Sequence, residues 1–357
     1  MIKQLEKPFE FLKRKDGSDY SPEIINNWYI ARAYVLDRLK DIAFGCNANK
    51  HLHVVIGGDS AILLAVARQV ALSAHFINNS RTVITLISSD TNIIDKIEQE
   101  EYLCNLPKYC KVTVNGECNN YDSYTDVELQ ILNEWHSDDD DCIMVTEKDI
   151  EDFCQSKQKE DIFSIDTRKA VLTGRVYTLG TDFKNLSAED IYNAQRYTQS
   201  LNAFQYYIME EKMMPMMSEK DKQLIVKEKL SNIICSDCFE TRAKEVALIG
   251  KANKNDESVW EDCNEALSKS EHDRWVVEKL IMGYRPLNQE ERMHDEQECL
   301  TKEMKRQYRK QLKSNPQDPA YIDLCSYNDL RRIKPDDLKY DSFLMLAIPK
   351  ILKKVNK

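Results

Sequence analysis

The sequence of 357 residues lacks any long apolar run. No stretch approaches the roughly 18 consecutive apolar residues that a helix needs to cross a bilayer. The first residues, "MIKQLEKPFEFLKRKDG", contain neither an uninterrupted apolar segment nor a small-residue cleavage site, so they do not resemble a secretory signal. We therefore expect a soluble, intracellular protein with no membrane insertion.

Positive charge is also in short supply. The chain has 50 Lys and Arg against 60 Asp and Glu, which gives a net charge of -10. Affinity for nucleic acid begins with the neutralisation of phosphates, so this balance argues against a dedicated nucleic-acid-binding protein. One local exception is the basic segment "KEMKRQYRKQLKS" at 302–314.

Paired cysteines and the common catalytic motifs are missing as well. The 11 cysteines are scattered and odd in number, which is typical of the reducing cytoplasm and not of a disulfide framework. Cys235 and Cys238 have the spacing of a metal or redox pair, but no second pair follows, so we interpret them as structural. The sequence contains no GxSxG, HExxH, P-loop or paired His-Asp signature, and we assign no catalytic residue and no metal ligand.

What the sequence does contain is an alternation of strand-like and helix-like segments. Short β-branched runs predict strands at 51–56, 81–90, 110–116 and 142–146, and a segment at 171–182 that closes the domain. Helical spacing of apolar residues predicts helices from Ser60 onward, at 91–106, and over "DVELQILNEWHS" at 126–137. This order predicts an α/β fold with a Rossmann-like parallel sheet covered by helices.

The same patterns suggest four regions. A helical lead-in occupies 1–45, with Ser21 as N-cap and Pro22 at the first helical position. A Rossmann-like domain follows at 46–186, then a helical connector at 187–257. The last region, 258–357, contains a helix, a polar insertion from 288 to about 320, and a closing helical segment.

The turn after the first strand lies where a Rossmann fold binds phosphate. Such a site uses glycine at three positions, which here hold Gly57, Asp59 and Ile62. Because the Asp59 carboxylate would repel a pyrophosphate, we expect weak or absent NAD binding. Asp90, after the second strand, has the position of a ribose-binding acid. Two interpretations stay open, a sheet without a site and a modified nucleotide site formed by Gly57, Gly58, Asp59, Ser60 and Asp90.

A second candidate is "SEHDRWVVEKLIMGYRPL" at 270–287. His272, Trp275 and Lys279 share one helical face, and Tyr284 follows the glycine that ends the helix. An indole beside a cation and an imidazole suits the stacking of a flat ring and the pairing of an anion. A buried structural cluster is the alternative interpretation.

This segment resembles the ryanodine receptor repeat domain, which also occurs as a small module in bacterial proteins. The family's first helix carries a histidine, a tryptophan three residues later, a basic residue, and then glycine and an aromatic residue. The matching residues here are His272, Trp275, Lys279, Gly283 and Tyr284, and in the second half Tyr327, Leu330, Pro335, Tyr340 and Asp341. The resemblance covers about 258–355, interrupted at 288–320, and implies a small, mainly α-helical domain.

The amino-terminal part is similar to the nucleotide-binding domain of bacterial potassium-uptake regulators. "HVVIGGDSAILLAVARQVALSAHF" followed by "RTVITLIS" carries the likeness. Relatives that join such a domain to a ryanodine receptor module have a fuller glycine motif, and some carry membrane segments, so this chain departs on both points. Together the resemblances imply a sensor of nucleotide-derived signals in bacterial phage defence.

Our leading hypothesis is a cytoplasmic sensor or accessory protein that binds a nucleotide or a nucleotide-derived second messenger. Trp275 or Tyr284 would stack a base, and Arg274 and Lys279 would pair with phosphate. The full set of expected ligand residues is His272, Arg274, Trp275, Lys279, Tyr284, Tyr327 and Asp341. We assign no cofactor beyond this nucleotide-type ligand, and a protein partner or a homo-oligomer stays open.

Two rival functions have their own sequence features. A phosphodiesterase acting on a nucleotide signal would use Asp59, Asp90 and the acidic run 138–141 to hold Mg²⁺ or Mn²⁺. A scaffold would use both regions only to bind proteins.

Overall fold

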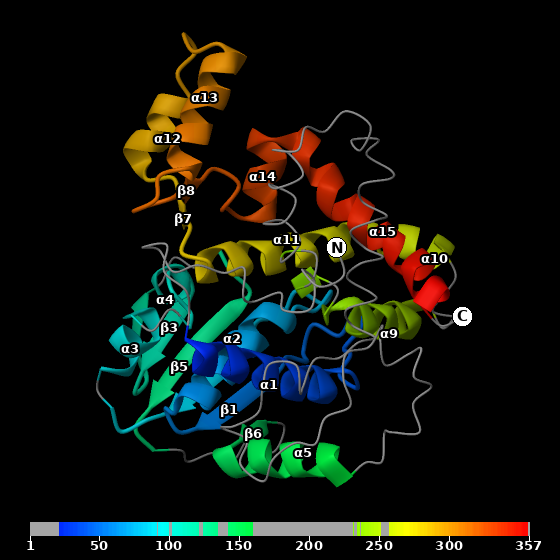
Figure 1. Cartoon of the computed structure of the whole chain (residues 1–357). Helices are drawn as coiled ribbons and strands as arrows, with labels where there is room; N and C mark the ends of the chain where they lie inside the picture. Colours follow the sequence, from blue (N-terminus) through cyan, green and yellow to red (C-terminus); the bar gives the residue numbers. More distant parts are fainter. Residues whose placement is uncertain are drawn as a thin grey trace.

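A mixed α/β architecture is seen in the computed structural model, in which a six-stranded sheet is covered by helices (Figure 1). The structure describes residues 21–90, 92–99, 102–120, 124–134, 142–159, 231, 234–235, 237–250 and 257–355. The predicted α/β class with a parallel sheet is confirmed. The segment 171–182, the acidic run 138–141 and most of the helical connector lie outside the described residues.

The sheet has the strand order β4-β3-β5-β2-β1-β6. Every pairing is parallel except that of β3 with β4, which is antiparallel. The strands are β1 (His53–Gly57), β2 (Thr82–Ile87), β3 (Lys111–Val114), β4 (Glu117–Asn120), β5 (Val127–Leu132) and β6 (Ile143–Val145). Val54, Val55 and Ile56 of β1 are all buried, as expected for an inner strand of a parallel sheet that is covered on both faces.

One predicted helix is a strand. The segment 126–137 forms β5, which lies in the sheet between β2 and β3. Its apolar residues Val127, Leu129 and Ile131 are buried at a spacing of two, the period of a strand. The helical prediction overlooked this alternation.

The antiparallel edge strand β4 was not predicted. Asn115 and Gly116 both have positive φ angles, of 47° and 86°, and connect β3 to β4. Asn-Gly is the residue pair that a tight hairpin turn favours, so the signal stood in the sequence.

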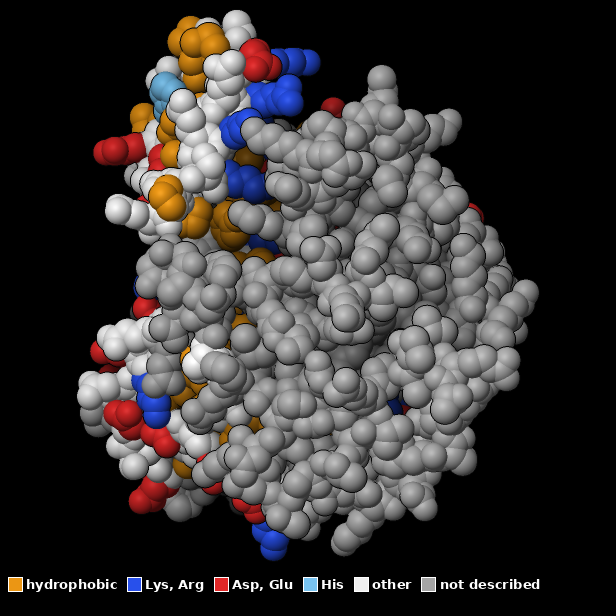
Figure 2. All heavy atoms as spheres, viewed as in Figure 1, with side chains coloured by type: hydrophobic (Ala, Val, Ile, Leu, Met, Phe, Trp, Pro, Cys, Tyr) orange, Lys and Arg blue, Asp and Glu red, His pale blue; other side chains and the backbone are white. Residues whose placement is uncertain are grey.

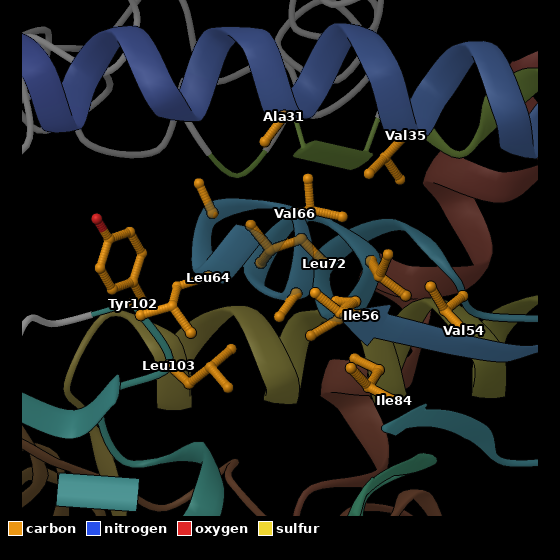
Figure 3. Close-up of a cluster of buried hydrophobic side chains, with 14 of the residues drawn as sticks. Ala31, Val35, Val54, Ile56, Leu64, Val66, Leu72, Ile84, Tyr102 and Leu103 are labelled. Atoms are coloured by element: carbon orange, nitrogen blue, oxygen red, sulfur yellow. The ribbon is translucent and has the colours of Figure 1, made fainter. Parts of the chain in front are cut away.

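The first helix belongs to the core of the sheet domain. α1 (Pro22–Leu39) begins at Ser21, whose hydroxyl accepts a hydrogen bond from the Ile24 amide, as the sequence predicts. It packs on α2 (Ala61–Ser73), with Ala31 and Val35 facing the apolar residues around Val66 (Figure 3). The described part of the predicted lead-in, 21–45, therefore packs on α2 and contributes to the core of the sheet domain.

Further helices complete the layers around the sheet and the carboxy-terminal region. They are α3 (Ile93–Gln99), α4 (Leu106–Tyr109), α5 (Glu147–Lys159), α9 (Phe239–Gly250), α10 (Glu257–Asp262), α11 (Asn264–Ile281), α12 (Gln289–Asp295), α13 (Lys302–Lys313), α14 (Tyr327–Ile333), the 3-10 turn η6 (Pro335–Asp337) and α15 (Leu338–Val355). The two-residue strands β7 (Arg285–Pro286) and β8 (Ala320–Tyr321) pair in parallel. Within the described ranges, none of the helices is both long and apolar enough to cross a bilayer.

α11 connects the two halves of the molecule. It lies between the sheet layer on one side and α14 and α15 on the other (Figure 1). Val276, Val277, Leu280 and Ile281 belong to the same buried apolar cluster as α2 and the central strands. The carboxy-terminal region thus shares its core with the sheet domain.

The polar insertion at 288–320 is folded. It forms α12 and α13 as a helical hairpin that projects from β7 and β8 (Figure 1). α12 begins with a capping box, in which Asn288 and Glu291 each bind the other's backbone amide.

Candidate ligand-binding sites

A glycine turn links β1 to α2. Gly58 has a φ of 134°, which side chains rarely tolerate, and its amide donates a hydrogen bond to the Ile87 carbonyl at 3.1 Å. A Cβ atom on Gly58 would lie 3.0 Å from the Leu63 Cδ1 atom. The turn therefore needs glycine both for its backbone angle and for the close approach of the following helix.

A cavity of about 390 Å³ opens at this turn. It lies at the carboxyl ends of β1 and β6. The strands on the two sides of β1 are β2 and β6, so the order of the strands reverses direction at β1. Open α/β sheets bind ligands at this switch point. The lining residues are Gly57, Gly58, Asp59, Ser60, Leu63, Thr146, Glu147 and Lys148.

The amino terminus of α2 faces the cavity without a side-chain cap. Ser60 is the N-cap residue, and its carbonyl accepts the Leu64 amide at 3.0 Å. Its hydroxyl is buried and forms no hydrogen bond in the described part of the chain. The first backbone N–H groups of an uncapped helix, together with the helix dipole, favour an anion.

The second helix that begins at this cavity is capped by its own residues. The Asp149 carboxylate accepts hydrogen bonds from the Thr146 amide at 2.8 Å and from the Thr146 hydroxyl at 2.6 Å. The Asp149 carboxylate is therefore already engaged at the start of α5. Of the two helices, α2 is the one that offers unused donors to a ligand.

Asp59 contacts Lys96 of α3. Lys96 donates a hydrogen bond to the Asp59 carbonyl at 3.1 Å and lies 4.0 Å from its carboxylate. The Ser88 hydroxyl lies 3.5 Å from the same carboxylate, whose side chain is 41 % exposed. The ammonium group offsets part of the negative charge that the sequence places beside the glycine turn.

Asp90, the expected ribose ligand, is not among the residues that line the cavity. Its carboxylate accepts the Asn92 amide at 2.8 Å, and its own amide donates to the Ser88 hydroxyl at 3.0 Å. Across the described ranges, no group of three or more His, Cys, Asp or Glu has the arrangement of a metal site. The acidic run 138–141 lies outside those ranges.

The carboxy-terminal residues predicted from the sequence do come together. The His272 and Trp275 rings stack with centroids 6.2 Å apart, and the Tyr327 ring lies 5.8 Å from His272. The Tyr321 ring lies between those of Trp275 and Tyr284 and meets both edge-on. Its centroid is 5.2 Å from that of Trp275 and 6.1 Å from that of Tyr284. These five rings form the aromatic cluster.

His272 connects α11 to α15 and to the segment just before α14. Its imidazole is buried, with Nε2 at 2.9 Å from the Cys325 carbonyl and Nδ1 at 3.6 Å from the Asp341 carboxylate. Burial lowers the pKa of His272, but the bonds to Asp341 and Cys325 outweigh it and raise the pKa to about 10. The ring thus joins α11 to Asp341 of α15.

Lys279 lies over the indole of Trp275, with its Nζ atom 5.6 Å from the ring centroid. The same ammonium donates to the Glu278 carboxylate at 2.6 Å and is only 15 % exposed. It is therefore a shielded, already paired cation at the edge of the cluster.

Arg274 has a different position from the one predicted. Its guanidinium is fully buried and donates to the carboxylates of Glu271 and Glu278 at 2.7–3.0 Å. Arg274 stands two residues after His272 and five before Lys279, which is roughly 200° and roughly 140° around the helix, so its side chain points away from both and into the interior. We leave it out of the candidate ligand residues.

Tyr321 and Lys313 are the members of this region that sequence reasoning missed. The Lys313 ammonium donates to the Tyr321 hydroxyl at 3.0 Å and lies 4.3 Å from the centre of its ring. Lys313 lies near the end of the polar insertion and Tyr321 directly after it, and the pairing of β7 with β8 brings Tyr321 to the aromatic cluster.

The cysteine pair is buried, in keeping with its structural interpretation. Cys235 and Cys238 are both enclosed, and the Cys238 thiol lies 3.5 Å from the Ser73 carbonyl. Burial raises the pKa of Cys238 to about 12, so its thiol stays protonated and unreactive.

Compared with protein-family models, with curated proteins and with solved structures, the chain matches none of them. The resemblances to the ryanodine receptor repeat domain and to potassium-uptake regulators stay predictions that rest on the residues quoted for them.

Proposed function

We propose that this protein is a sensor that binds a nucleotide-type ligand in the cavity between β1 and β6. The observation that carries the proposal is the coincidence of three features at one place. The cavity lies at the switch point of the sheet, the glycine turn lets a ligand approach the backbone, and the amino terminus of α2 is uncapped.

The size and the charge of the cavity limit the kinds of ligand that fit it. About 390 Å³ falls in the lower part of the range for small-molecule sites, which is roughly 300–1,000 Å³. The N–H groups of α2 offer one anion site, and the Asp59 carboxylate beside it disfavours a second phosphate. These features favour a ligand with one phosphate group at the turn over the pyrophosphate of NAD.

The state of Ser60 favours binding over nucleophilic catalysis by this residue. The hydroxyl of Ser60 has no hydrogen-bond partner in the described part of the chain, so no general base is in place to activate it as a nucleophile. The resemblances drawn from the sequence supply the rest of the proposal, a cytoplasmic role in bacterial phage defence.

A thermal-shift panel tests this function on the full-length protein. The panel contains AMP, ADP, ADP-ribose, NAD and cyclic dinucleotides, and each sample is checked afterwards for products by mass spectrometry. We expect at least one mononucleotide-type compound to raise the melting temperature and to be recovered intact, since a ligand that binds only the folded state stabilises it. Turnover of the ligand would favour the phosphodiesterase, and no shift with any compound would favour the scaffold.

The aromatic cluster is a second candidate place for the same ligand, because Lys279 lies over the Trp275 ring. The variants Lys279→Gln and Lys279→Arg separate the two places. If the ligand binds between β1 and β6, both variants keep the affinity of the wild type. If it binds at the aromatic cluster, the loss of the cation in Lys279→Gln weakens binding and Lys279→Arg preserves most of it.

A further inference from the structure

The α12–α13 hairpin is a rigid projection. At its base, Arg285 donates to both Asp318 and Glu291 at 2.7–2.8 Å. Between its helices, the Arg309 guanidinium makes two bonds of 2.7 Å to Asp295. Paired bonds of this kind fix the relative position of the groups they join, so the surface of α13 is held in one orientation.

α13 is strongly basic in an acidic protein. It carries Lys302, Lys305, Arg306, Arg309, Lys310 and Lys313 against the single acid Glu303, a net charge of +5, whereas the whole chain has -10. None of its residues is buried. Figure 2 shows Lys and Arg side chains following one another along one edge of the hairpin.

Three of these cations form a ridge. Lys302, Arg306 and Lys310 stand four residues apart, so they lie in a row of about 12 Å along one side of the helix. All three are exposed, and the Arg306 side chain is 83 % exposed, 3.8 Å from Glu303. Lys302 and Lys310 form no ion pair with any described residue.

The apolar residues of α13 lie on another side of the helix. Met304, Tyr308 and Leu312 also stand four residues apart, and the Tyr308 ring packs against His294 of α12 with centroids 4.4 Å apart. Met304 is 50 % exposed but is turned about 160–200° from Lys302 at 100° per residue. The ridge therefore presents charge with no apolar side chain beside it.

The separation of the cations from the apolar residues of α13 distinguishes between three kinds of anionic partner. A helix that lies in a membrane surface needs its apolar face next to its cations. A protein interface needs aromatic or aliphatic anchors at its centre. The phosphate backbone of a nucleic acid needs only spaced cations on a rigid support, as this ridge provides.

We propose that the ridge Lys302–Arg306–Lys310 binds the phosphate backbone of nucleic acid without reading its sequence. The net charge of the rest of the chain repels nucleic acid at a distance, so the contact is an accessory one and works at low salt. With three phosphates neutralised, the slope of log K against log salt is about -2.7 for duplex DNA. Affinity then falls by about 40-fold from 50 to 200 mM salt.

Fluorescence anisotropy of a labelled DNA duplex of random sequence, titrated with the full-length protein, tests the proposal. The test variant replaces Lys302, Arg306 and Lys310 by Gln. The control variant replaces Lys40, Arg332 and Lys339 by Gln, since these are exposed cations outside α13. Gln preserves helix propensity, and thermal melts of both variants verify that they fold as the wild type does.

The expected result is salt-dependent binding by the wild type and by the control variant, with affinity at least 10-fold lower in the test variant. Equal binding by the test variant and the wild type would overturn the proposal, as would the absence of DNA binding by the wild type at 50 mM salt. Binding to phosphatidylserine vesicles without DNA binding would also overturn it and favour a membrane. A dimer that only the test variant loses, without DNA binding, would overturn it in favour of a second copy of the chain.

Discussion

The side-chain amide of Asn105 donates a 2.7 Å hydrogen bond to the carbonyl oxygen of Gly283. The same amide reaches the Tyr284 carbonyl at 2.9 Å, and the Asn105 backbone amide donates to Leu280 at 3.1 Å. Asn105 belongs to the sheet domain, Leu280 lies in the last turn of α11, and Gly283 and Tyr284 follow the helix. One residue therefore satisfies a carbonyl group of the last turn and two carbonyl groups just beyond the helix that carries His272 and Trp275.

We expect Asn105→Ala to lower the free energy of unfolding by about 2 kcal/mol, because it leaves two carbonyl groups without their donor. Urea denaturation measures the change, with Asn49→Ala as an exposed control. Because the apolar core is shared across α11, one transition should shift as a whole. Two separate transitions, of which only one moves, would contradict the shared core.

Arg274→Met should cost about 3–5 kcal/mol of stability, because it leaves the Glu271 carboxylate buried without its cation and leaves Glu278 with Lys279 alone. Arg274→Lys should recover only part of this loss, since an ammonium cannot make the same paired bonds. Chemical denaturation reports both values. A stable Arg274→Met protein with reduced ligand affinity would instead restore the sequence-based role of Arg274 as a phosphate ligand.

Trp275→Ala should destabilise the protein by about 2–3 kcal/mol, somewhat less than a fully buried tryptophan, because Trp275 is half-buried against His272 and Tyr321. Trp275→Phe should recover much of that loss by keeping the edge contact with Tyr321. Melts with and without the best nucleotide give the stability and the ligand effect together. An unchanged melting temperature with no response to the nucleotide would place the ligand at the aromatic cluster.

Glu245 should make stability depend on pH. Burial raises its pKa to about 7, although Arg242 and the backbone amides of Ile77 and Phe44 act in the opposite direction. Between about pH 4.5 and 7 the folded chain then holds a proton that the unfolded chain has lost. Stability therefore falls as pH rises through this window, by at most about 3 kcal/mol from this group.

The variant Glu245→Gln isolates that contribution. Burial also raises the pKa of Asp273, so a second carboxyl group makes stability fall as pH rises. Asp273 is present in both proteins, so the difference between their free energies of unfolding comes from Glu245. The free energies of unfolding are measured between pH 5 and 8. The free energy of unfolding of Glu245→Gln should rise relative to that of the wild type as pH rises. Parallel curves would rule out the raised pKa of Glu245.

The order of strands and helices was predictable where the signal is local. The run from His53 through the glycine turn into α2 shows its strand, turn and helix in consecutive residues. β5 was predicted wrongly because its six residues carry a period of two inside a longer segment that also suits a helix. In the same way the Asn115-Gly116 turn was visible but was not used.

The candidate sites were predictable only in part, for a physical reason. Helical spacing places His272, Trp275 and Lys279 on one face, and the structure has them so. The same spacing places Glu271 and Glu278 beside Arg274, a signal that the sequence reasoning did not use. Helical spacing cannot show that Tyr321, which lies 46 residues after Trp275, reaches the cluster through the β7–β8 pair. Long-range contacts of this kind depend on the packing of the whole chain.

Ser60 gives the most direct test of the proposed ligand site between β1 and β6. Ser60→Asp and Ser60→Asn both cap α2 well, so both should keep or raise stability. Only the aspartate puts a negative charge where the phosphate of the ligand is expected. Isothermal titration calorimetry with the best nucleotide of the panel then compares the two, and NAD serves as a reference that we expect to bind more weakly than about 100 μM, or roughly 5.5 kcal/mol. We predict at least 10-fold weaker nucleotide binding to Ser60→Asp than to Ser60→Asn, whereas equal affinities in two folded variants would contradict a phosphate site at the amino terminus of α2.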